Sequence, residues 1–315
     1  MSKKIIIIGA GHVGAAVAHS LVVRGLGDEI GVLDLNEKKA YGEVLDLQHA
    51  LPYTANSAQQ LFVADYEDTK DADIIVFALH SEKAVYNDST DRLSLLAENA
   101  KEAKAVAKSA HAAGFKGVYI VISNPVDIIT RIVQEHSGLP VNQVLGTGTL
   151  LETSRLKSIL SQKLDVNPKV VDGFAIGEHG FSAFGAWSTV TVEGKSVKEV
   201  YPELDFDQLD QEIRDSAYEV FFARNGVTSY GIANVAVRLV EAIVEDQHVA
   251  LAVGTYVNGE YGLKGIYIGT PAVIGKNGVE KVLELPLTKK ELEKLNNSYQ
   301  ILSNHYETLK SGEKQ

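Results

Sequence analysis

The feature that most constrains the fold of this chain is a short apolar run that leads directly into closely spaced glycines. Residues 5–8 are four consecutive isoleucines, and glycine follows at positions 9, 11 and 14. The first glycine permits a tight turn, the second lets the backbone approach a pyrophosphate, and the third lets the next helix pack close to the strand. Residues 4–24 therefore predict the strand, turn and helix that open a dinucleotide-binding fold.

The rest of the chain divides into two kinds of pattern. Up to about residue 123, β-branched runs (30–34, 60–63, 73–79, 117–123) alternate with amphipathic segments (13–24, 37–50, 92–113). This alternation is typical of a parallel sheet with helices on both faces. Later strands (170–176, 187–192, 250–257, 266–270, 272–274) and helices (150–162, 206–223, 229–246, 288–309) are mixed. We predict an α/β fold: a Rossmann doubly wound parallel sheet over 1–145, followed by an α+β substrate/catalytic domain over 146–315.

An acidic residue follows the glycines at the expected distance. Asp34 ends the second predicted strand, twenty positions past Gly14. A carboxylate there accepts hydrogen bonds from ribose hydroxyls and repels a 2′-phosphate, which favours NAD over NADP. The simpler explanation is a glycine turn beside an exposed aspartate, and FAD proteins share the fingerprint, although nothing else here indicates a flavin. The predicted cofactor contacts are Gly9, Gly11, His12, Val13, Gly14, Asp34 and Asn124.

Composition excludes several classes of function. The net charge of −11 argues against nucleic acid as a partner. The absence of cysteine rules out disulfides, thiolate metal sites and a cysteine nucleophile. The histidines show no ligand spacing, so we expect no metal site. The apolar run at 5–8 is too short for a signal-peptide core or a membrane span, so we expect a cytoplasmic protein with no membrane partner.

Three later segments are more specific than the glycine turn. They read Ser-Asn-Pro-Val-Asp at 123–127, Gly-Thr-Gly-Thr-Leu-Leu-Glu-Thr-Ser-Arg at 146–155 and Gly-Glu-His-Gly at 177–180. In this order and spacing, the chain resembles the lactate/malate dehydrogenase superfamily along nearly its whole length. It is most similar to L-2-hydroxyisocaproate dehydrogenases, through residues 146–151, Ala-Trp-Ser-Thr-Val at 186–190 and Thr-Ser-Tyr-Gly at 228–231.

The resemblance implies an NAD-dependent L-2-hydroxy acid dehydrogenase with three catalytic residues. His179 would exchange a proton with the substrate oxygen, and Glu152 would orient it from the position where the family normally has aspartate. Arg92 would polarise the substrate carbonyl. Histidine titrates near neutrality and therefore serves both directions of the reaction. A carboxylate beside it stabilises the imidazolium, and an arginine stabilises negative charge on the carbonyl oxygen.

Four further residues would bind the substrate. By resemblance, Arg155 grips the substrate carboxylate, which suits the two-pronged guanidinium. Asn124 would lie near the nicotinamide and the substrate, and Thr228 and Tyr86 would border the substrate side chain. Ordinary structural explanations exist as well. His179 fits a loop histidine with a satisfied hydrogen bond, Arg155 a pair with Glu152 or Asp165, and Arg92 a pair with Asp88 or Asp91.

The segment 80–91 bears on the choice of substrate. Lactate enzymes place a glutamine, and malate enzymes an arginine, at the spacing from Arg92 where this chain has Tyr86. No cation is then available for a second carboxylate, which disfavours oxaloacetate. Ala84, Val85 and Tyr86, with Val227, indicate a roomier apolar pocket, suited to 2-oxoisocaproate or phenylpyruvate.

Several alternatives remain open. The chain fits an L-lactate dehydrogenase with an atypical substrate loop, or a catalytically silent dinucleotide-binding sensor. An NAD-dependent glycosidase shares the nucleotide fold, but its metal site uses cysteine. By resemblance, helices 13–24 and 229–246 pack at subunit interfaces, so we expect a homotetramer or homodimer. Sugar-bisphosphate-responsive relatives carry a basic pair where this chain has Lys157 and Asp172, and the acidic residue argues against that effector.

Overall fold

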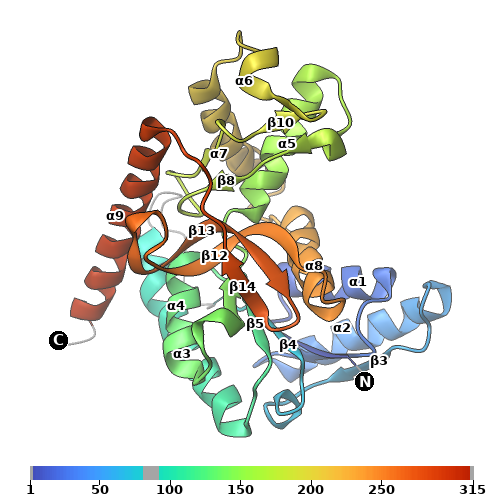
Figure 1. Ribbon diagram of the computed structural model, residues 1–315. Coiled ribbons are helices and arrows are strands. Elements are labelled where there is room, and N and C mark those ends of the chain that lie inside the picture. Colours follow the sequence, from blue (N-terminus) through green and yellow to red (C-terminus); the bar gives the residue numbers. More distant parts are fainter. Residues whose placement is uncertain (1–2, 81–91, 313–315) are drawn as a thin grey trace. The chain divides into compact units, whose positions relative to one another are not determined.

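The structure is a computed structural model that describes residues 3–80 and 92–312 (Figure 1). For residues 92–95 and 312 it describes the backbone alone. The chain divides into two compact units. The first comprises Met1–Gly146, Ser229–Val249 and Ile274–Glu280, and the second comprises Thr147–Thr228, Ala250–Val273 and Lys281–Gln315. Residues 229–249 and 274–280 group with the first unit although they follow residue 146 in the sequence. The division into domains 1–145 and 146–315 stays a prediction.

The first unit contains the predicted parallel sheet. Its strands are β1 (Lys4–Ile8), β2 (Glu29–Leu33), β3 (Gln60–Val63), β4 (Ile74–Phe77), β5 (Val118–Val121) and β6 (Val144–Gly146). They lie in the order β6-β5-β4-β1-β2-β3, and every neighbouring pair is parallel. β1, β4 and β5 are buried along their whole length, as expected for strands covered on both faces. The Rossmann-type sheet is thereby confirmed.

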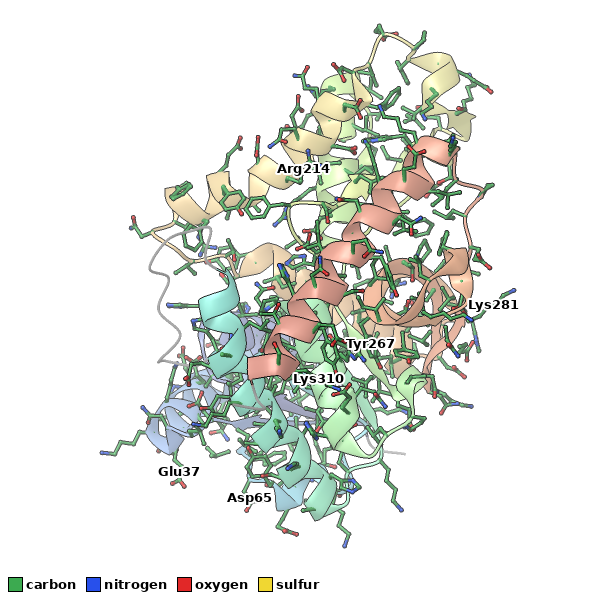
Figure 2. The ribbon with its side chains drawn as sticks, turned by 90° about the vertical axis from the view of Figure 1, so that its left-hand side faces the viewer. Glu37, Asp65, Arg214, Tyr267, Lys281 and Lys310 are labelled. Atoms are coloured by element: carbon green, nitrogen blue, oxygen red, sulfur yellow. The ribbon has the colours of Figure 1, made fainter. Side chains whose placement is uncertain are left out.

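Helices accompany these strands in the first unit. They are α1 (His12–Arg24), α2 (Glu37–Ala50), α3 (Arg92–Ala113), α4 (Val126–Ser137) and α8 (Tyr230–Val244), with 3-10 turns η1 (Leu51–Tyr53), η2 (Glu67–Thr69) and η3 (Val141–Gln143). α1 packs against α8. Acidic side chains such as Glu37 and Asp65 lie at the surface of this unit (Figure 2).

The second unit is a mixed α+β structure, as predicted. Its helices are α5 (Leu150–Leu164), α6 (Val197–Val200), α7 (Phe206–Ala223) and α9 (Lys289–Gly312), with 3-10 turns η4 (Pro168–Val170) and η5 (Glu260–Gly262). Its short strands are β7 (Val171–Asp172), β8 (Ala175–Ile176), β9 (Phe184–Gly185), β10 (Thr191–Val192) and β11 (Lys195–Ser196). The strands β12 (Val249–Asn258), β13 (Lys264–Gly275) and β14 (Gly278–Val282) are sheet neighbours in the order β14-β13-β12.

One apolar cluster holds α5 and α7 together. It joins Leu156 and Leu160 of α5 to Leu209 and Ile213 of α7, and it includes Trp187. The indole nitrogen of Trp187 donates a hydrogen bond of 2.7 Å to the buried carboxylate of Asp210. The core therefore fixes the helix that carries Glu152 and Arg155.

Three predicted elements were wrong in detail. The single strand at 170–176 is two strands, because Gly173 has φ +142° and a side chain there would lie 2.7 Å from Val190. The strand at 187–192 shrinks to Thr191–Val192, because the chain turns at Ala186–Thr189. The strands at 266–270 and 272–274 are one continuous strand, β13.

The described residues contain no helix with both the length and the apolar composition needed to cross a bilayer.

Candidate active site

The glycine turn after β1 has the shape that a dinucleotide needs. Gly9 has φ +106°, and a side chain there would meet the carbonyl oxygen of Ala78 at 2.7 Å. A side chain at Gly14 would lie 1.8 Å from the carbonyl oxygen of Gly9, so α1 packs directly on the turn. At Gly11 an added Cβ meets nothing within 4 Å, which leaves room at the amino terminus of α1. The turn therefore fits a pyrophosphate, which helix amino termini bind through their N–H groups.

Asp34 lies beside this turn, immediately after β2. Its Oδ2 accepts a hydrogen bond of 2.7 Å from the backbone N–H of Ala10, and its Oδ1 accepts one of 2.9 Å from Asn36. The carboxylate is half-buried, so it remains accessible to a ligand at this edge of the sheet. His12 and Val13 are the first residues of α1. The structure thus brings together the residues from 9 to 14 and Asp34 that the sequence assigned to NAD.

Asn124 follows β5 in the same unit. Its side chain is exposed, and its backbone oxygen accepts a hydrogen bond of 2.8 Å from the buried side chain of Asn99. The neighbouring Ser123 hydroxyl donates to the backbone oxygen of Leu79, after β4. Because β1, β4 and β5 are parallel neighbours, Asn124 lies at the same carboxyl edge of the sheet as the glycine turn.

Replacing Gly11 by alanine tests this cofactor cradle. Its φ of −74° suits alanine and the space is open, so we expect the variant to fold with an unchanged midpoint of thermal unfolding. The added methyl group would hinder a pyrophosphate, so the Kd for NADH should rise about 10- to 100-fold. NADH fluorescence titration measures this. Gly42→Ala, also in open space, is the control. Equal NADH affinity in the two variants would contradict the placement of the cofactor.

The second unit brings Glu152, Arg155 and His179 together. Glu152 and Arg155 lie in the first turns of α5, and His179 follows β8. Nδ1 of His179 lies 2.9 Å from Oε1 and 3.1 Å from Oε2 of Glu152. One guanidinium nitrogen of Arg155 donates to Oε1 of Glu152 at 3.1 Å. The glutamate side chain thus contacts both partners. The pair with Arg155 is the ordinary structural explanation of that arginine, and the roles of the three residues stay a prediction.

The carboxylate of Glu152 is charged although it is buried. Its residue is 3% exposed. Burial alone would raise the pKa of Glu152, but the charge and hydrogen bond of His179, together with Arg155, lower it below its usual value. A buried ionised carboxylate fixes the ring orientation of the histidine and stabilises its protonated form. A histidine held in this way is suited to exchange a proton with a ligand.

The lowered pKa of Glu152 predicts a pH-dependent contribution to stability. A depressed folded-state pKa stabilises the fold above the unfolded value of about 4.3, and this contribution is lost as pH falls through the folded value. Glu152→Gln breaks a buried pair and should therefore cost about 3–5 kcal/mol of unfolding free energy near pH 6. The cost should shrink toward pH 3. Urea unfolding at a series of pH values measures it, with the exposed Glu199→Gln as control. A cost that stays constant down to pH 3 would refute the argument.

An aromatic group that the sequence analysis missed lies near His179. Phe181, two residues further on, stacks on Tyr218 of α7 with ring centroids 5.7 Å apart, and Tyr218 stacks on Phe222 at 6.4 Å. Phe181 and Phe222 are 52% and 65% exposed. The spacing of aromatic residues at 218, 221 and 222 on one helix face was the available signal. Thr228 and Val227 follow α7, and both are half-buried.

Two predicted site residues fall outside this description. Arg92 begins α3, but its side chain lies outside the described residues. Tyr86, with Ala84 and Val85, lies entirely outside them.

A group of charged residues around His248 forms ion pairs. Nδ1 of His248 lies 2.6 Å from Glu280 and its Nε2 lies 3.5 Å from Asp246, which also pairs with Lys276. The hydrogen bond to Glu280 and the attraction of both carboxylates raise the pKa of His248. Because each ring nitrogen faces its own carboxylate, the group suits an imidazolium better than a metal ligand.

Lys157 and Asp172, which the sequence resemblance matches to an effector site of some relatives, also form an ion pair. Lys157 lies 3.8 Å from Asp172, with the aspartate side chain largely exposed.

Comparison with known proteins covers nearly the whole chain. The model for the lactate/malate dehydrogenase NAD binding domain matches residues 3–146, and that for the alpha/beta C-terminal domain of the same enzymes matches residues 149–313. An L-lactate dehydrogenase from Macrococcus caseolyticus is 40% identical over 305 residues, which is 95% of each chain. One from Lacticaseibacillus casei is 37% identical over 94% of this chain and 91% of its own.

Solved structures agree with these relatives. The minor L-lactate dehydrogenase of Enterococcus mundtii, in its ligands-bound form, superposes with a TM-score of 0.92 at 34% identity over 98% of both chains. A lactate dehydrogenase from a deep-sea metagenome library also gives 0.92, at 33% identity over 98% of this chain and all of its own.

Proposed function

This chain belongs to the lactate/malate dehydrogenase family and is an NAD-dependent oxidoreductase that acts on hydroxy acids, and from that membership we propose its substrate and the residues that act on it. The proposed reaction converts a 2-oxo acid with a bulky apolar side chain, NADH and a proton into the L-2-hydroxy acid and NAD. 2-Oxoisocaproate is the representative substrate. The observation that carries the proposal is the contact of His179 with the buried carboxylate of Glu152, beside Arg155.

We propose a division of labour among these three residues. The protonated imidazole of His179 gives its proton to the substrate oxygen, while bound NADH supplies the hydride to the carbonyl carbon. Glu152 holds Nδ1, so Nε2 is the atom that delivers the proton. The guanidinium of Arg155 binds the substrate carboxylate through two parallel hydrogen bonds. In the reverse direction, neutral His179 accepts the proton of the hydroxyl group.

The remaining site residues have supporting roles in this proposal. Arg92 would stabilise negative charge as it develops on the carbonyl oxygen. Asn124, at the carboxyl edge of the sheet, would contact the nicotinamide and the substrate. Thr228 and Tyr86 would border the substrate side chain.

Two observations support a bulky apolar side chain. Tyr86 replaces the glutamine or arginine that lactate and malate enzymes place at that spacing. The half-buried Val227 and the aromatic group of Phe181, Tyr218 and Phe222 supply apolar surface in the unit that carries His179. A second candidate is L-lactate dehydrogenase, because the relatives and solved structures described above carry that name.

The proposal is tested by following NADH oxidation with pyruvate, oxaloacetate, 2-oxobutyrate, 2-oxoisocaproate and phenylpyruvate. We expect kcat/KM for 2-oxoisocaproate or phenylpyruvate to exceed that for pyruvate by about 10-fold or more. A clear preference for pyruvate would instead establish the lactate enzyme. NADH binding without turnover of any acid would overturn both and leave a dinucleotide-binding sensor.

We also propose that the chain forms a homo-oligomer, a tetramer or a dimer. The pairing of α1 with α8 supports this, because it places in one bundle the two helices that the resemblance assigns to subunit interfaces. Size-exclusion chromatography with light scattering measures the mass directly. A monomer at micromolar concentration would contradict the proposal.

A further inference from the structure

The turn that carries His179 is closed by its own side chains. Glu178 precedes the histidine and is 7% exposed. Its Oε2 accepts a hydrogen bond of 2.6 Å from the hydroxyl of Ser182 and one of 3.3 Å from the Ser182 backbone N–H. The two residues therefore clamp the turn on either side of His179. The ion pairs formed by the described residues do not include Glu178. These two hydrogen bonds therefore replace hydrogen bonds to water that its carboxylate loses on burial.

A residue of the C-terminal helix completes this arrangement. Ser298 lies on α9 and is 0% exposed. Its hydroxyl lies 2.9 Å from the hydroxyl and 3.1 Å from the backbone oxygen of Ser182. A serine hydroxyl has one proton, and that of Ser182 is donated to Glu178. Ser298 is therefore the donor, and its one proton is shared between the hydroxyl and the backbone oxygen of Ser182. Ser298 thus binds Ser182, which in turn binds Glu178.

Ser298 also packs against the start of the turn. Gly177 has φ +104°, and a side chain there would lie 2.7 Å from the Ser298 hydroxyl oxygen. The backbone of Gly177 exchanges two hydrogen bonds of 2.9 Å with Gly269 of β13. The first residue of the turn is thus hydrogen-bonded to β13, and the side chain of Ser298 packs against it.

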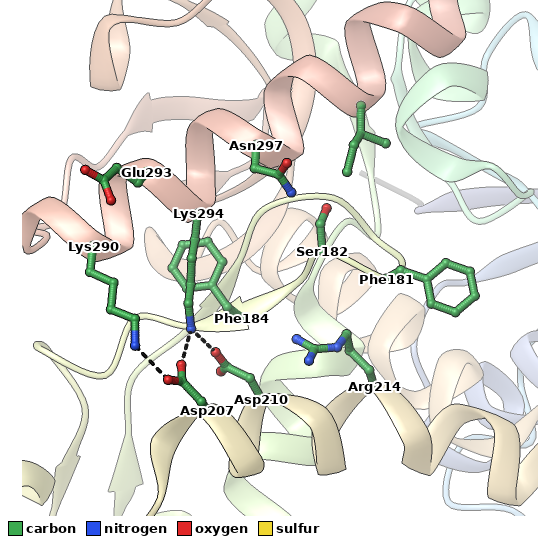
Figure 3. A pocket seen from close by; sticks show the side chains of 11 residues that line it. Phe181, Ser182, Phe184, Asp207, Asp210, Arg214, Lys290, Glu293, Lys294 and Asn297 are labelled. Carbon is green, nitrogen blue, oxygen red and sulfur yellow. Dashed lines mark hydrogen bonds and ion pairs between the residues drawn. The ribbon is translucent and has the colours of Figure 1, made fainter.

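The face of α9 that carries Ser298 is itself anchored. Lys290, Lys294 and Ser298 follow at intervals of four residues and therefore share one helix face. Lys294 lies 2.6 Å from the buried Asp210 and 2.8 Å from Asp207, and Lys290 lies 2.6 Å from Asp207 (Figure 3). Both aspartates belong to α7. These ion pairs border a pocket of about 580 Å³ that Ser182 also lines.

We propose that Ser298 is a positioning residue for the proton donor: it holds the His179 turn through Ser182 and Glu178, so that the ring meets Glu152 in the correct geometry. This inference rests on the proposed role of His179. It assigns to the C-terminal helix a part in catalysis without contact with the substrate. His179 is then held in two ways: Glu152 holds its ring, and Ser298, acting through Ser182 and Glu178, holds the backbone of its turn.

The experiment compares Ser298→Ala, Ser182→Ala and the double variant with the parent enzyme. Ser303→Ala, on the same helix, is the matched control, and Ser182→Thr keeps the hydroxyl. Each of the first two variants should lower kcat for 2-oxo acid reduction about 10-fold, because small displacements of a catalytic group are costly. The double variant should lose no more than either single one, since both break the same series of hydrogen bonds. The Kd for NADH should be unchanged, and Ser182→Thr should retain kcat within about twofold.

A second readout separates positioning from general destabilisation. Among the contacts of the described residues, the carboxylate of Glu152 lies against the His179 ring and is itself paired with Arg155 of the same helix, while Glu178 precedes His179 in the turn. A ring displaced from Glu152 holds its proton less firmly, so the pH at which oxo-acid reduction is half-maximal should shift downward in both alanine variants. Losses that multiply in the double variant, or alanine variants that match Ser303→Ala in kcat and pH profile, would overturn the inference. Full activity of a His179→Asn enzyme would instead overturn the proposed role of His179, and this inference with it.

Discussion

Replacing His179 by asparagine is expected to lower kcat for 2-oxo acid reduction about 1,000-fold. Asparagine can accept the geometry of the turn, but it cannot exchange a proton near neutral pH. It also removes the contact between His179 and the buried carboxylate of Glu152, which keeps its pair with Arg155. Steady-state assays of NADH oxidation measure the loss, and the exposed His49→Asn serves as the control.

The same variant should change the response of binding to pH. In the proposed mechanism the parent enzyme binds the oxo acid with His179 protonated, so affinity should fall as pH rises through the range in which the imidazole loses its proton. The asparagine variant should bind the oxo acid equally across that range. A parent enzyme whose oxo-acid affinity does not vary between pH 5 and pH 9 would remove His179 from the mechanism.

Replacing Arg155 by leucine is expected to lower kcat/KM for 2-oxo acids by about 100- to 10,000-fold. In the proposed complex this substitution removes two hydrogen bonds to the substrate carboxylate, each worth about 1.5–3 kcal/mol. Arg155→Lys should recover part of the loss, because a single ammonium keeps the charge but not the paired geometry. Stopped-flow binding to the NADH complex separates affinity from chemistry.

A ketone that lacks the carboxylate provides the matched control for Arg155. This ketone has the same side chain as the oxo acid but no carboxylate, so it never contacts Arg155 in the proposed complex. The leucine variant should therefore reduce the ketone at a rate within about threefold of that of the parent enzyme. If the substitution lowers reduction of the simple ketone as much as reduction of the oxo acid, then Arg155 acts by supporting Glu152, and the substrate carboxylate has another partner.

The parts of the fold that sequence predicted well are those governed by local pattern. Buried β-branched runs, three glycines at fixed spacing and helical periodicity predicted the parallel sheet and most of its helices. α4 was missed although its signal was present: Pro125 precedes it, and Ile128, Ile129, Ile132 and Val133 recur at helical spacing. The break at Gly173 depends on the approach of Val190, which no local pattern contains.

The candidate site shows the same limit. Family spacing pointed to Glu152, Arg155 and His179, and the structure places both Arg155 and His179 within hydrogen-bonding distance of Glu152. The ordinary explanation of Arg155, a pair with Glu152, describes a real contact too, because one guanidinium can serve both a neighbour and a ligand. Ser298 could not be found from sequence, because it meets Ser182 across 116 positions and a lone serine in a polar helix has no distinguishing pattern.

The hydrogen bond between Asp34 and Ala10 limits how the cofactor preference of this enzyme can be re-engineered. The carboxylate that we expect to select NAD is also the acceptor for a backbone N–H of the glycine turn, at 2.7 Å. A substitution that admits a 2′-phosphate by removing that carboxylate would leave the amide without its acceptor and loosen the turn that both cofactors require. Conversion to NADP therefore needs two changes at once, a new acceptor for Ala10 and a new cation for the phosphate. Single substitutions at position 34 should lose NADH binding before they gain any for NADPH.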